Sequence, residues 1–268
     1  MSHVEHIGMF TTVDQMDDPG VFIGLLDRIE GVADVQALRK DLVGRLELRA
    51  GQSVLDLGCG TGDHTRELAA LVAPGGRAVG VDFSSTMIGE ALTRQASSRL
   101  PAAFEQGDAQ QLRFESGTFD AARTERMLCH VPDHEAALRE MARVVRPGGR
   151  VGVIDVDLAG MMIDNGDREI TDAFVAAMAG TIQHPYVGRT LRRIMTEAGL
   201  VDVDVRGRMI DCPFGLVETL IDGHATLMLD SGVPRPAVEG WKRELEYANL
   251  GGTFFMVMPF FAAVGRKP

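Results

Sequence analysis

The chain has 268 residues, of which 45% are hydrophobic and 24% are charged, as is typical of globular proteins. This composition excludes a disordered or fibrous protein, and the length suffices for one α/β domain with insertions. The net charge of −11 repels a nucleic-acid backbone. We therefore expect no nucleic-acid partner, and a small molecule becomes the expected substrate.

The three cysteines are an odd number without a C-x-x-C pair, which argues against disulfides and against a structural metal site, so no metal is expected. No apolar run approaches the ~20 residues that a membrane-spanning helix needs. Residues 1–10 also lack the basic and apolar regions of a signal peptide. We expect a cytoplasmic protein without a membrane partner. A homodimer remains an open alternative for its assembly.

The chain begins with an irregular segment, residues 1–31, which we interpret as an N-terminal lid ahead of a domain over residues 32–268. An amphipathic helix over residues 32–48 leads into the first strand. Apolar runs then predict strands that alternate with helical segments, which favours an α/β fold with a parallel, doubly wound sheet. These strands are expected at residues 53–57, 78–82, 102–106, 119–124 and 151–156, and the helices at 64–72, 85–99 and 134–145.

Two Pro-Gly-Gly runs, at residues 74–76 and 147–149, each predict the end of a helix, because proline cannot continue a helix and glycine accepts a left-handed conformation. Further along, a helix is expected over residues 187–198 and a strand over 201–206. The last apolar run, residues 253–264, contains a proline, which predicts an edge strand or two separate pieces.

Two stretches, residues 157–186 and 211–250, are not needed by this sheet. We interpret them as helical cap insertions that cover the ends of the strands.

Three glycines, Gly58, Gly60 and Gly62, alternate after the first strand and before the next helix, so the bare backbone can turn sharply and approach a ligand. Asp82 follows at the end of the next strand, where its carboxylate can accept hydrogen bonds from both hydroxyls of a ribose. These features together predict a nucleoside site. The alternative is a tight turn, with Asp82 capping the following helix.

The type of nucleoside follows from the residue before the loop. A dinucleotide site prefers G-x-G-x-x-G and an open helix N-terminus for the pyrophosphate, whereas this loop is G-x-G-x-G and directly follows Asp56-Leu57. A carboxylate there repels phosphates and favours a cationic ligand. S-adenosylmethionine carries an ammonium and a sulfonium and has no phosphate. A nicotinamide dehydrogenase remains a less favoured alternative.

Residues 56–62 resemble motif I of the class I S-adenosylmethionine-dependent methyltransferases. The similarity continues over residues 52–156, and the motifs at 107–109, 119–120, 128–133 and 138–149 resemble the small-molecule group related to ubiquinone and menaquinone biosynthesis (type 11). This resemblance implies a Rossmann-like sheet of seven strands, mostly parallel and with an antiparallel last strand. The last apolar run would supply that strand.

The resemblance implies S-adenosylmethionine as the cofactor and S-adenosylhomocysteine as the product. Asp56 or the adjacent glycine backbone would contact the amino-acid part, Asp82 the ribose and Asp108 the adenine amine. A place in the hydrophobic core remains an alternative for Met87, and a solvated ion-pair cluster remains one for Glu125. The implied cofactor-binding residues are Asp56, Gly58, Cys59, Gly60, Thr61, Gly62, Asp82, Phe83, Met87, Gly107, Asp108, Ala109, Thr124 and Glu125.

His130 is the candidate catalytic residue, because a neutral imidazole can remove a proton from an acceptor hydroxyl or an acidic carbon. Similar sugar O-methyltransferases carry two adjacent histidines here, whereas this chain has Cys129-His130. A packed histidine bonded to the backbone remains an alternative.

The expected reaction is methyl transfer to oxygen or carbon of a small molecule, by in-line displacement in a dry pocket, in secondary or natural-product metabolism. Cyclisation or rearrangement without methyl transfer is the alternative. Position in the chain and apolar character suggest a set of substrate-side residues, although ordinary packing explains them equally well. They are His184, Tyr186, Phe214 and Trp241.

Overall fold

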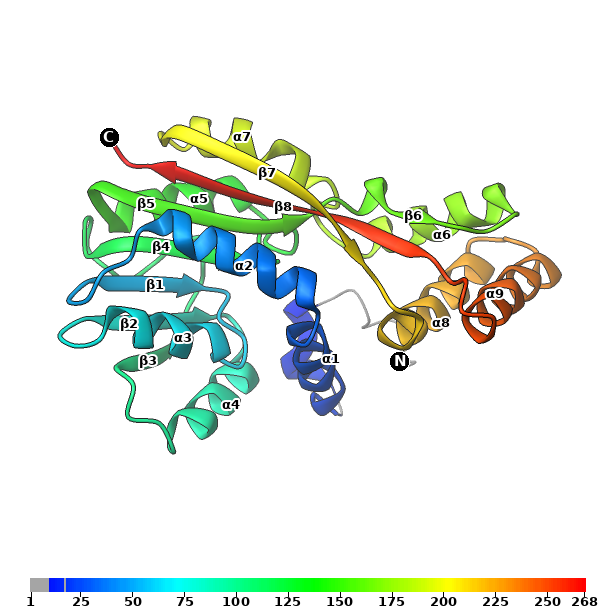
Figure 1. Ribbon diagram of the computed structural model, residues 1–268, viewed down its shortest axis with the longest axis horizontal. Coiled ribbons are helices and arrows are strands. Elements are labelled where there is room, and N and C mark those ends of the chain that lie inside the picture. Colours follow the sequence, from blue (N-terminus) through cyan, green and yellow to red (C-terminus); the bar gives the residue numbers. More distant parts are fainter. Residues whose placement is uncertain (1–9, 17) are drawn as a thin grey trace.

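The computed structural model describes residues 10–16 and 18–268 and contains a mixed sheet with helices on both faces (Figure 1). Five parallel strands form the first part of the sheet, in the order β3-β2-β1-β4-β5. The four strands inward of the edge strand β3 are mostly apolar and buried because helices cover both faces. The strands are β1 (Ser53–Leu57), β2 (Arg77–Asp82), β3 (Ala102–Gln106), β4 (Phe119–Glu125) and β5 (Val145–Val156).

The helices divide between the two faces as right-handed crossovers require, since the chain leaves β1 toward one edge and β4 toward the other. One face carries α2 (Ala33–Leu46), α3 (Asp63–Val72) and α4 (Ser85–Gln95). The other carries α5 (His134–Val144) and α7 (Val187–Glu197). The doubly wound α/β fold predicted from the sequence is therefore confirmed.

The sheet is completed by β6 (Met162–Ile163), β7 (Val201–Asp211) and β8 (Met256–Arg266). β8 runs antiparallel between β5 and β7, which confirms the antiparallel last strand. The two-residue β6 is an addition to the seven strands expected.

The prediction that Pro259 breaks or marginalises the last strand is wrong, because β8 is continuous and paired on both sides. The Pro259 carbonyl accepts a hydrogen bond from the Asp157 amide at 3.0 Å, just beyond the end of β5. The N–H that proline lacks would point to the same side as this carbonyl, toward β5. Because β5 has already ended there, no hydrogen bond between β5 and β8 is lost.

The second Pro-Gly-Gly run also behaves differently from the prediction. It lies inside β5, which starts at Val145 immediately after α5 ends at Val144. A register shift between Phe119 and Ala121 accommodates this run. The helix predicted over residues 85–99 ends earlier, at Gln95.

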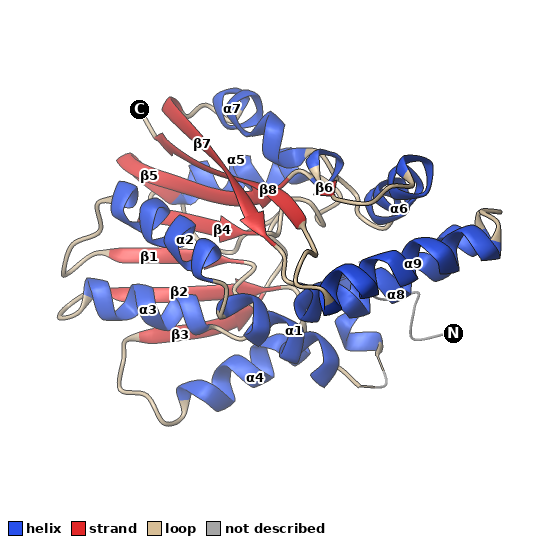
Figure 2. Cartoon of the chain, turned by 45° about the vertical axis from the view of Figure 1, so that its right-hand side comes forward, coloured by secondary structure: helices blue, strands red, loops and turns tan. Residues whose placement is uncertain are grey.

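Three further helices lie beyond the carboxyl ends of the strands (Figure 1): α6 (Arg168–Gly180), α8 (Phe214–Asp230) and α9 (Arg235–Leu250). α1 (Gly20–Glu30) lies between them and the sheet, and Figure 2 shows it beside α8 and α4. Within the ranges that the structure describes, none of the helices is long and apolar enough to cross a membrane.

Candidate active site

Two cavities meet at the carboxyl ends of β1 and β4, where parallel sheets of this kind bind ligands. The first, of about 410 Å³, surrounds the glycine loop, and we call it the loop cavity. The second, of about 150 Å³, lies among α1, α6, α8 and β8, and we call it the apolar cavity. Arg126 and His130 line both cavities, so these two residues mark their junction.

The glycine loop needs its glycines for two physical reasons. Gly58 and Gly60 have φ values of 70° and 52°, in the left-handed region. A Cβ at Gly58 would also lie 2.7 Å from Cγ of Met127. The amides of Gly58 and Cys59 both donate to the Val81 carbonyl, at 2.7 Å and 3.1 Å, which fixes the loop against β2.

Asp82 lies at the end of β2, lines the loop cavity and holds the glycine loop. Its two carboxylate oxygens accept hydrogen bonds from the amides of Gly60 at 2.8 Å and Ser84 at 2.9 Å. Burial raises the pKa of this carboxyl above its usual value. Because each carboxylate oxygen can accept two hydrogen bonds, Asp82 retains the capacity to accept two donors from a ligand.

Asp56 forms part of the floor of the loop cavity and is buried. Its Oδ2 accepts a hydrogen bond from the Thr65 hydroxyl at 2.7 Å, and its Oδ1 lies 3.5 Å from Nη1 of Arg123. At the opposite rim, the exposed Asp108 accepts hydrogen bonds from the amide and side chain of Gln110, at 2.8 Å and 3.0 Å. The cavity therefore has a carboxylate at each end.

Most of the predicted cofactor residues surround this one space. Phe83 is exposed on its rim, whereas Met87 is buried in its wall and so belongs both to the site and to a small apolar cluster. The predicted residues that line the loop cavity are Asp56, Gly58, Cys59, Gly60, Thr61, Asp82, Phe83, Met87, Gly107, Asp108, Ala109 and Glu125.

Two predicted residues do not line the loop cavity. Thr124 is fully buried and points to the opposite face of β4 from Arg123 and Glu125, because successive side chains of a strand alternate. Gly62 caps α3 with a φ of 79°, and a Cβ there would lie 2.4 Å from the ring of Phe104. Glycine at this position therefore allows the start of α3 to pack closely against β3.

Glu125 lines the loop cavity at the end of β4, but its carboxylate is bound by arginines. Arg39 of α2 donates to its two oxygens at 2.6 Å and 2.7 Å, and Arg123 donates at 2.8 Å. Burial alone would raise the pKa of Glu125, yet the hydrogen bond from Arg39 and the charges of Arg126 and Arg123 hold it well below its usual range. The alternative of a solvated ion-pair cluster is wrong in one respect: the ion pairs are present, but Arg123 and Glu125 are buried.

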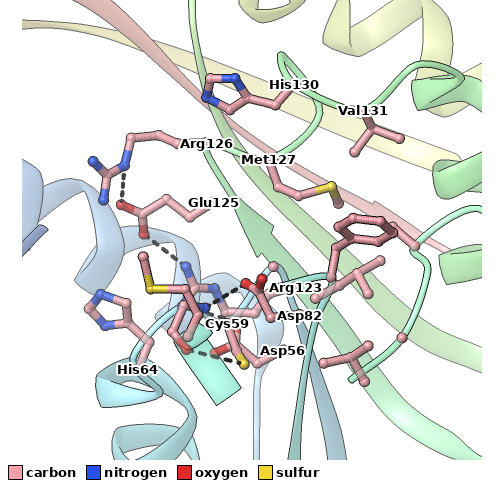
Figure 3. A pocket seen from close by; sticks show the side chains of 18 of the residues that line it. Asp56, Cys59, His64, Asp82, Arg123, Glu125, Arg126, Met127, His130 and Val131 are labelled. Atoms are coloured by element: carbon pink, nitrogen blue, oxygen red, sulfur yellow. Dashed lines mark hydrogen bonds and ion pairs between the residues drawn. The ribbon is translucent and has the colours of Figure 1, made fainter. Parts of the chain in front are cut away.

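His130 lies in the turn after β4 and lines both cavities. Figure 3 shows its ring near Arg126 and Met127. Its amide donates to the Met127 carbonyl at 2.9 Å. Burial and the nearby charge of Arg126 lower the pKa of the imidazole to about 4. The ring is therefore neutral near pH 7, the state in which a histidine can accept a proton.

The turn that carries His130 has an unusual backbone. Arg126 adopts a φ of 51°, in the left-handed region that non-glycine residues rarely use. Its amide donates to the Ile154 carbonyl of β5 at 2.8 Å. Such conformations gather at functional sites, where surrounding contacts enforce them.

None of the four predicted substrate-side residues lines either cavity. The His184 ring packs against that of His134 at a tilt of 57°, with centroids 4.0 Å apart, and the half-exposed Tyr186 lies under the Arg189 guanidinium. Phe214 packs on Phe254, and the buried Trp241 donates to the Thr171 hydroxyl at 2.9 Å. The contacts described for these four residues are with neighbouring protein groups, and their role toward a substrate stays a prediction.

The sequence analysis missed His224, which lines the apolar cavity from α8. A signal was present in the sequence, because Val217, Ile221, His224 and Met228 recur at helical spacing and all four are buried. A single histidine in an otherwise apolar stripe indicates a polar group facing a core or a ligand.

Comparison with known proteins relates the chain to methyltransferases. Residues 54–149 match the family described as Methyltransferase domain. A demethylmenaquinone methyltransferase of Staphylococcus aureus is 31% identical over 183 residues, which are 63% of this chain and 76% of that protein. An uncharacterized 37.1 kDa protein in transposon TN4556 of Streptomyces fradiae is 37% identical over 179 residues, 66% of this chain and 51% of that protein.

The chain spans about half the length of several of these curated relatives. Among solved structures, the YcgJ protein of Bacillus subtilis superposes with a TM-score of 0.60 at 18% identity, over 87% of this chain and 99% of that chain. At this identity the likeness shows a shared fold.

Proposed function

Because the chain belongs to the class I S-adenosylmethionine-dependent methyltransferases of the ubiquinone and menaquinone type, we propose that it transfers a methyl group from S-adenosylmethionine to a small-molecule acceptor. The observation that supports this most is the arrangement of the two cavities. A glycine-walled cavity lined by carboxylates adjoins, at Arg126 and His130, a cavity with a largely apolar lining.

The residues of the loop cavity suit the chemistry of this cofactor. Asp82 can accept two further hydrogen bonds and would hold the ribose hydroxyls. Asp108 would hold the adenine amine, and Asp56 with the Gly58 backbone would hold the ammonium group. A larger side chain at Gly58 would be strained at its positive φ and would collide with Met127, so glycine is favoured at this position in the cavity wall.

When bound, the cofactor supplies a methyl group already activated by the sulfonium. The remaining task of the chain is alignment in a dry space, an effect that can reach ~7 to 11 kcal/mol for well-oriented groups. The apolar cavity would exclude water and hold the acceptor for in-line attack. His130 would remove the proton from the acceptor hydroxyl or acidic carbon, a contribution of roughly 10² to 10⁴ in rate.

The apolar cavity favours a lipophilic acceptor. Leu25 and Ile29 of α1, Met178 of α6 and Leu216 and Leu220 of α8 contribute side chains to its wall. The name of the S. aureus relative makes a demethylated menaquinol the first acceptor to test. Lipophilic phenols of natural-product metabolism are the second.

We assign the segment up to residue 31 as a lid over the loop cavity, as the sequence predicts. Leu26 and Glu30 of α1 line this cavity. Ahead of α1, the Asp14 carboxylate accepts hydrogen bonds from the amides of Ser85 at 2.9 Å and Thr86 at 3.1 Å, at the start of α4. Residues 1–9 lie outside the described part of the chain. Residues 157–186 and 211–250 would be the cap insertions that enclose the acceptor.

The experiment is a reaction of the full chain with methyl-labelled S-adenosylmethionine and demethylmenaquinol, in which labelled product and S-adenosylhomocysteine are both counted. We expect one S-adenosylhomocysteine for each methylated product. A converted acceptor without S-adenosylhomocysteine would instead support cyclisation, which the methyltransferase names of the relatives do not favour. A Gly58→Val variant is the control that should lose cofactor binding.

A further inference from the structure

His224 is a buried polar side chain that the proposed function does not use. It lies on α8, is 2% exposed and lines the apolar cavity among mostly aliphatic side chains. The ring packs edge-on against Phe174 of α6, with centroids 6.0 Å apart. A buried imidazole in such surroundings requires hydrogen-bond partners for both ring nitrogens.

The first ring nitrogen fixes the tautomer. Nδ1 lies 2.7 Å from the carbonyl oxygen of Leu220, one turn earlier on α8. A carbonyl oxygen only accepts, so Nδ1 must carry the proton. Burial lowers the pKa of His224, which keeps the ring neutral near pH 7. Nε2 is therefore an unprotonated acceptor.

The second ring nitrogen has only a weak protein contact. Nε2 lies 3.4 Å from Oγ1 of Thr181, at the end of α6. The Thr181 hydroxyl has one proton, which it donates to the Met178 carbonyl at 2.8 Å. Within the described residues, Nε2 thus shares its one neighbouring hydroxyl with a closer carbonyl, so its contact with Thr181 is the weaker of the two.

The place of His224 in the site separates it from the reacting atoms. Arg126 and His130 line both cavities, whereas His224 lines only the apolar cavity. A group bound at Nε2 therefore lies away from the cofactor side of the junction. His224 suits a role in positioning the acceptor.

We propose that Nε2 of His224 accepts a hydrogen bond from a hydroxyl or N–H group of the bound acceptor, remote from the atom that is methylated. The site would thereby select apolar ring systems that carry a hydrogen-bond donor, over equally shaped rings that lack one. A buried acceptor left without its donor is costly, which is the physical basis of such selectivity. This inference rests on the proposed function only in identifying the ligand as the methyl acceptor.

The test uses two probes of nearly the same shape, 2-naphthol and 2-methylnaphthalene, of which only the first has a donor. Calorimetry measures the dissociation constant of each probe for the full chain, with and without S-adenosylhomocysteine. The ratio of the two constants cancels the shared apolar contribution. We expect the preference for 2-naphthol to fall about tenfold in His224→Leu, the loss expected for one buried hydrogen bond.

Two further variants separate recognition from disturbed packing. His224→Gln keeps an acceptor oxygen on a flexible side chain and should retain part of the preference. Thr181→Val removes the neighbouring hydroxyl. Because we propose that His224, and not Thr181, binds the donor group of the ligand, this variant should keep the full preference for 2-naphthol. The thermal midpoint of each variant confirms that it is folded.

An unchanged ratio in folded His224→Leu would overturn the proposal. A folded Thr181→Val variant that loses as much preference as His224→Leu would also overturn it. Failure of the wild-type chain to bind either probe would also overturn it. Absence of S-adenosylhomocysteine binding would contradict the proposed function instead, while the probe ratio measured without it would still decide the role of His224.

Discussion

Arg39 and Glu125 form a buried two-point ion pair that joins α2 to the end of β4, with Nε–Oε2 and Nη2–Oε1 distances of 2.6 Å and 2.7 Å. Arg123 contacts the same carboxylate. Glu125→Gln would leave these buried arginines without their counter-charge. We expect it to reduce the free energy of unfolding by about 3 to 5 kcal/mol, measured by chemical denaturation.

The control for this loss is Glu197→Gln, at an ion pair with Arg193 on α7 whose side chains are 51% and 57% exposed. Water screens such a pair, so the expected change is at most ~0.5 kcal/mol. Equal effects of the two substitutions would contradict a structural role for the buried pair.

The same arginine holds the end of the proposed lid. Arg39 Nη2 donates to Glu30 at 2.8 Å, and Nε2 of His64 lies 2.9 Å from the same carboxylate. Burial alone would lower the pKa of His64, but its contacts with the carboxylates of Glu30 and Glu67 raise it. Glu30→Gln should loosen α1 and accelerate its amide hydrogen exchange roughly tenfold.

Asp27→Asn is the matched control on the same helix. Asp27 pairs with Arg94 at 3.0 Å, but its side chain is about half exposed. Exchange in α1 should change little in this variant. Equally fast exchange in both variants would show that Glu30 does not secure α1.

His130→Asn tests the candidate base. Loss of the imidazole removes the proton acceptor at the junction, so kcat should fall by about 10² to 10⁴. The affinity for S-adenosylhomocysteine should stay unchanged, because the loop and Asp82 are intact. His134→Asn, at a histidine that lines neither cavity, should keep full activity. An unaltered kcat in His130→Asn would assign the ring to packing.

The pH dependence follows from the depressed pKa of His130, which lies at about 4. The active form of a general base is the neutral one, and it is present above its pKa. As pH falls from 7.5 to 5.5, kcat/KM should stay on a plateau and decline only toward pH 4.

An ordinary histidine, with a pKa of about 6.5, would already be ~90% protonated at pH 5.5. An inflection near pH 6.5 in the wild type that is absent in His130→Asn would contradict the lowered pKa. Circular dichroism at each pH separates this titration from loss of folded protein.

Local patterns in the sequence predicted much of the fold and many of the residues that line the loop cavity. Five apolar strands, the alternating glycines and Asp82 at a strand end depend on neighbours in the chain or on the next crossover. The structure brings all of these together. The orientation of Thr124 could also be predicted from the sequence, since side chains alternate along a strand and Thr124 therefore lies on the opposite face of β4 from Arg123 and Glu125.

Contacts between segments that are distant in the chain could not be predicted from the sequence patterns. Arg39 and Glu125 are 86 residues apart, and only the packing of α2 places one over the other. The exact packing of the cap helices decides whether an aromatic side chain faces a cavity or a neighbouring helix, which is why the sequence left two alternatives open for Trp241 and Phe214. Pro259 was misjudged because the end of its partner strand could not be known.

The central claim is that the glycine loop cavity binds a sulfonium nucleoside, and calorimetry of the purified chain with S-adenosylhomocysteine tests it directly, with NAD⁺ as the competing ligand. The account predicts one S-adenosylhomocysteine per chain, no detectable NAD⁺, and binding weakened by roughly 10- to 100-fold in Asp82→Ala through the loss of charged hydrogen bonds. Tight binding of NAD⁺ with none of S-adenosylhomocysteine would contradict it.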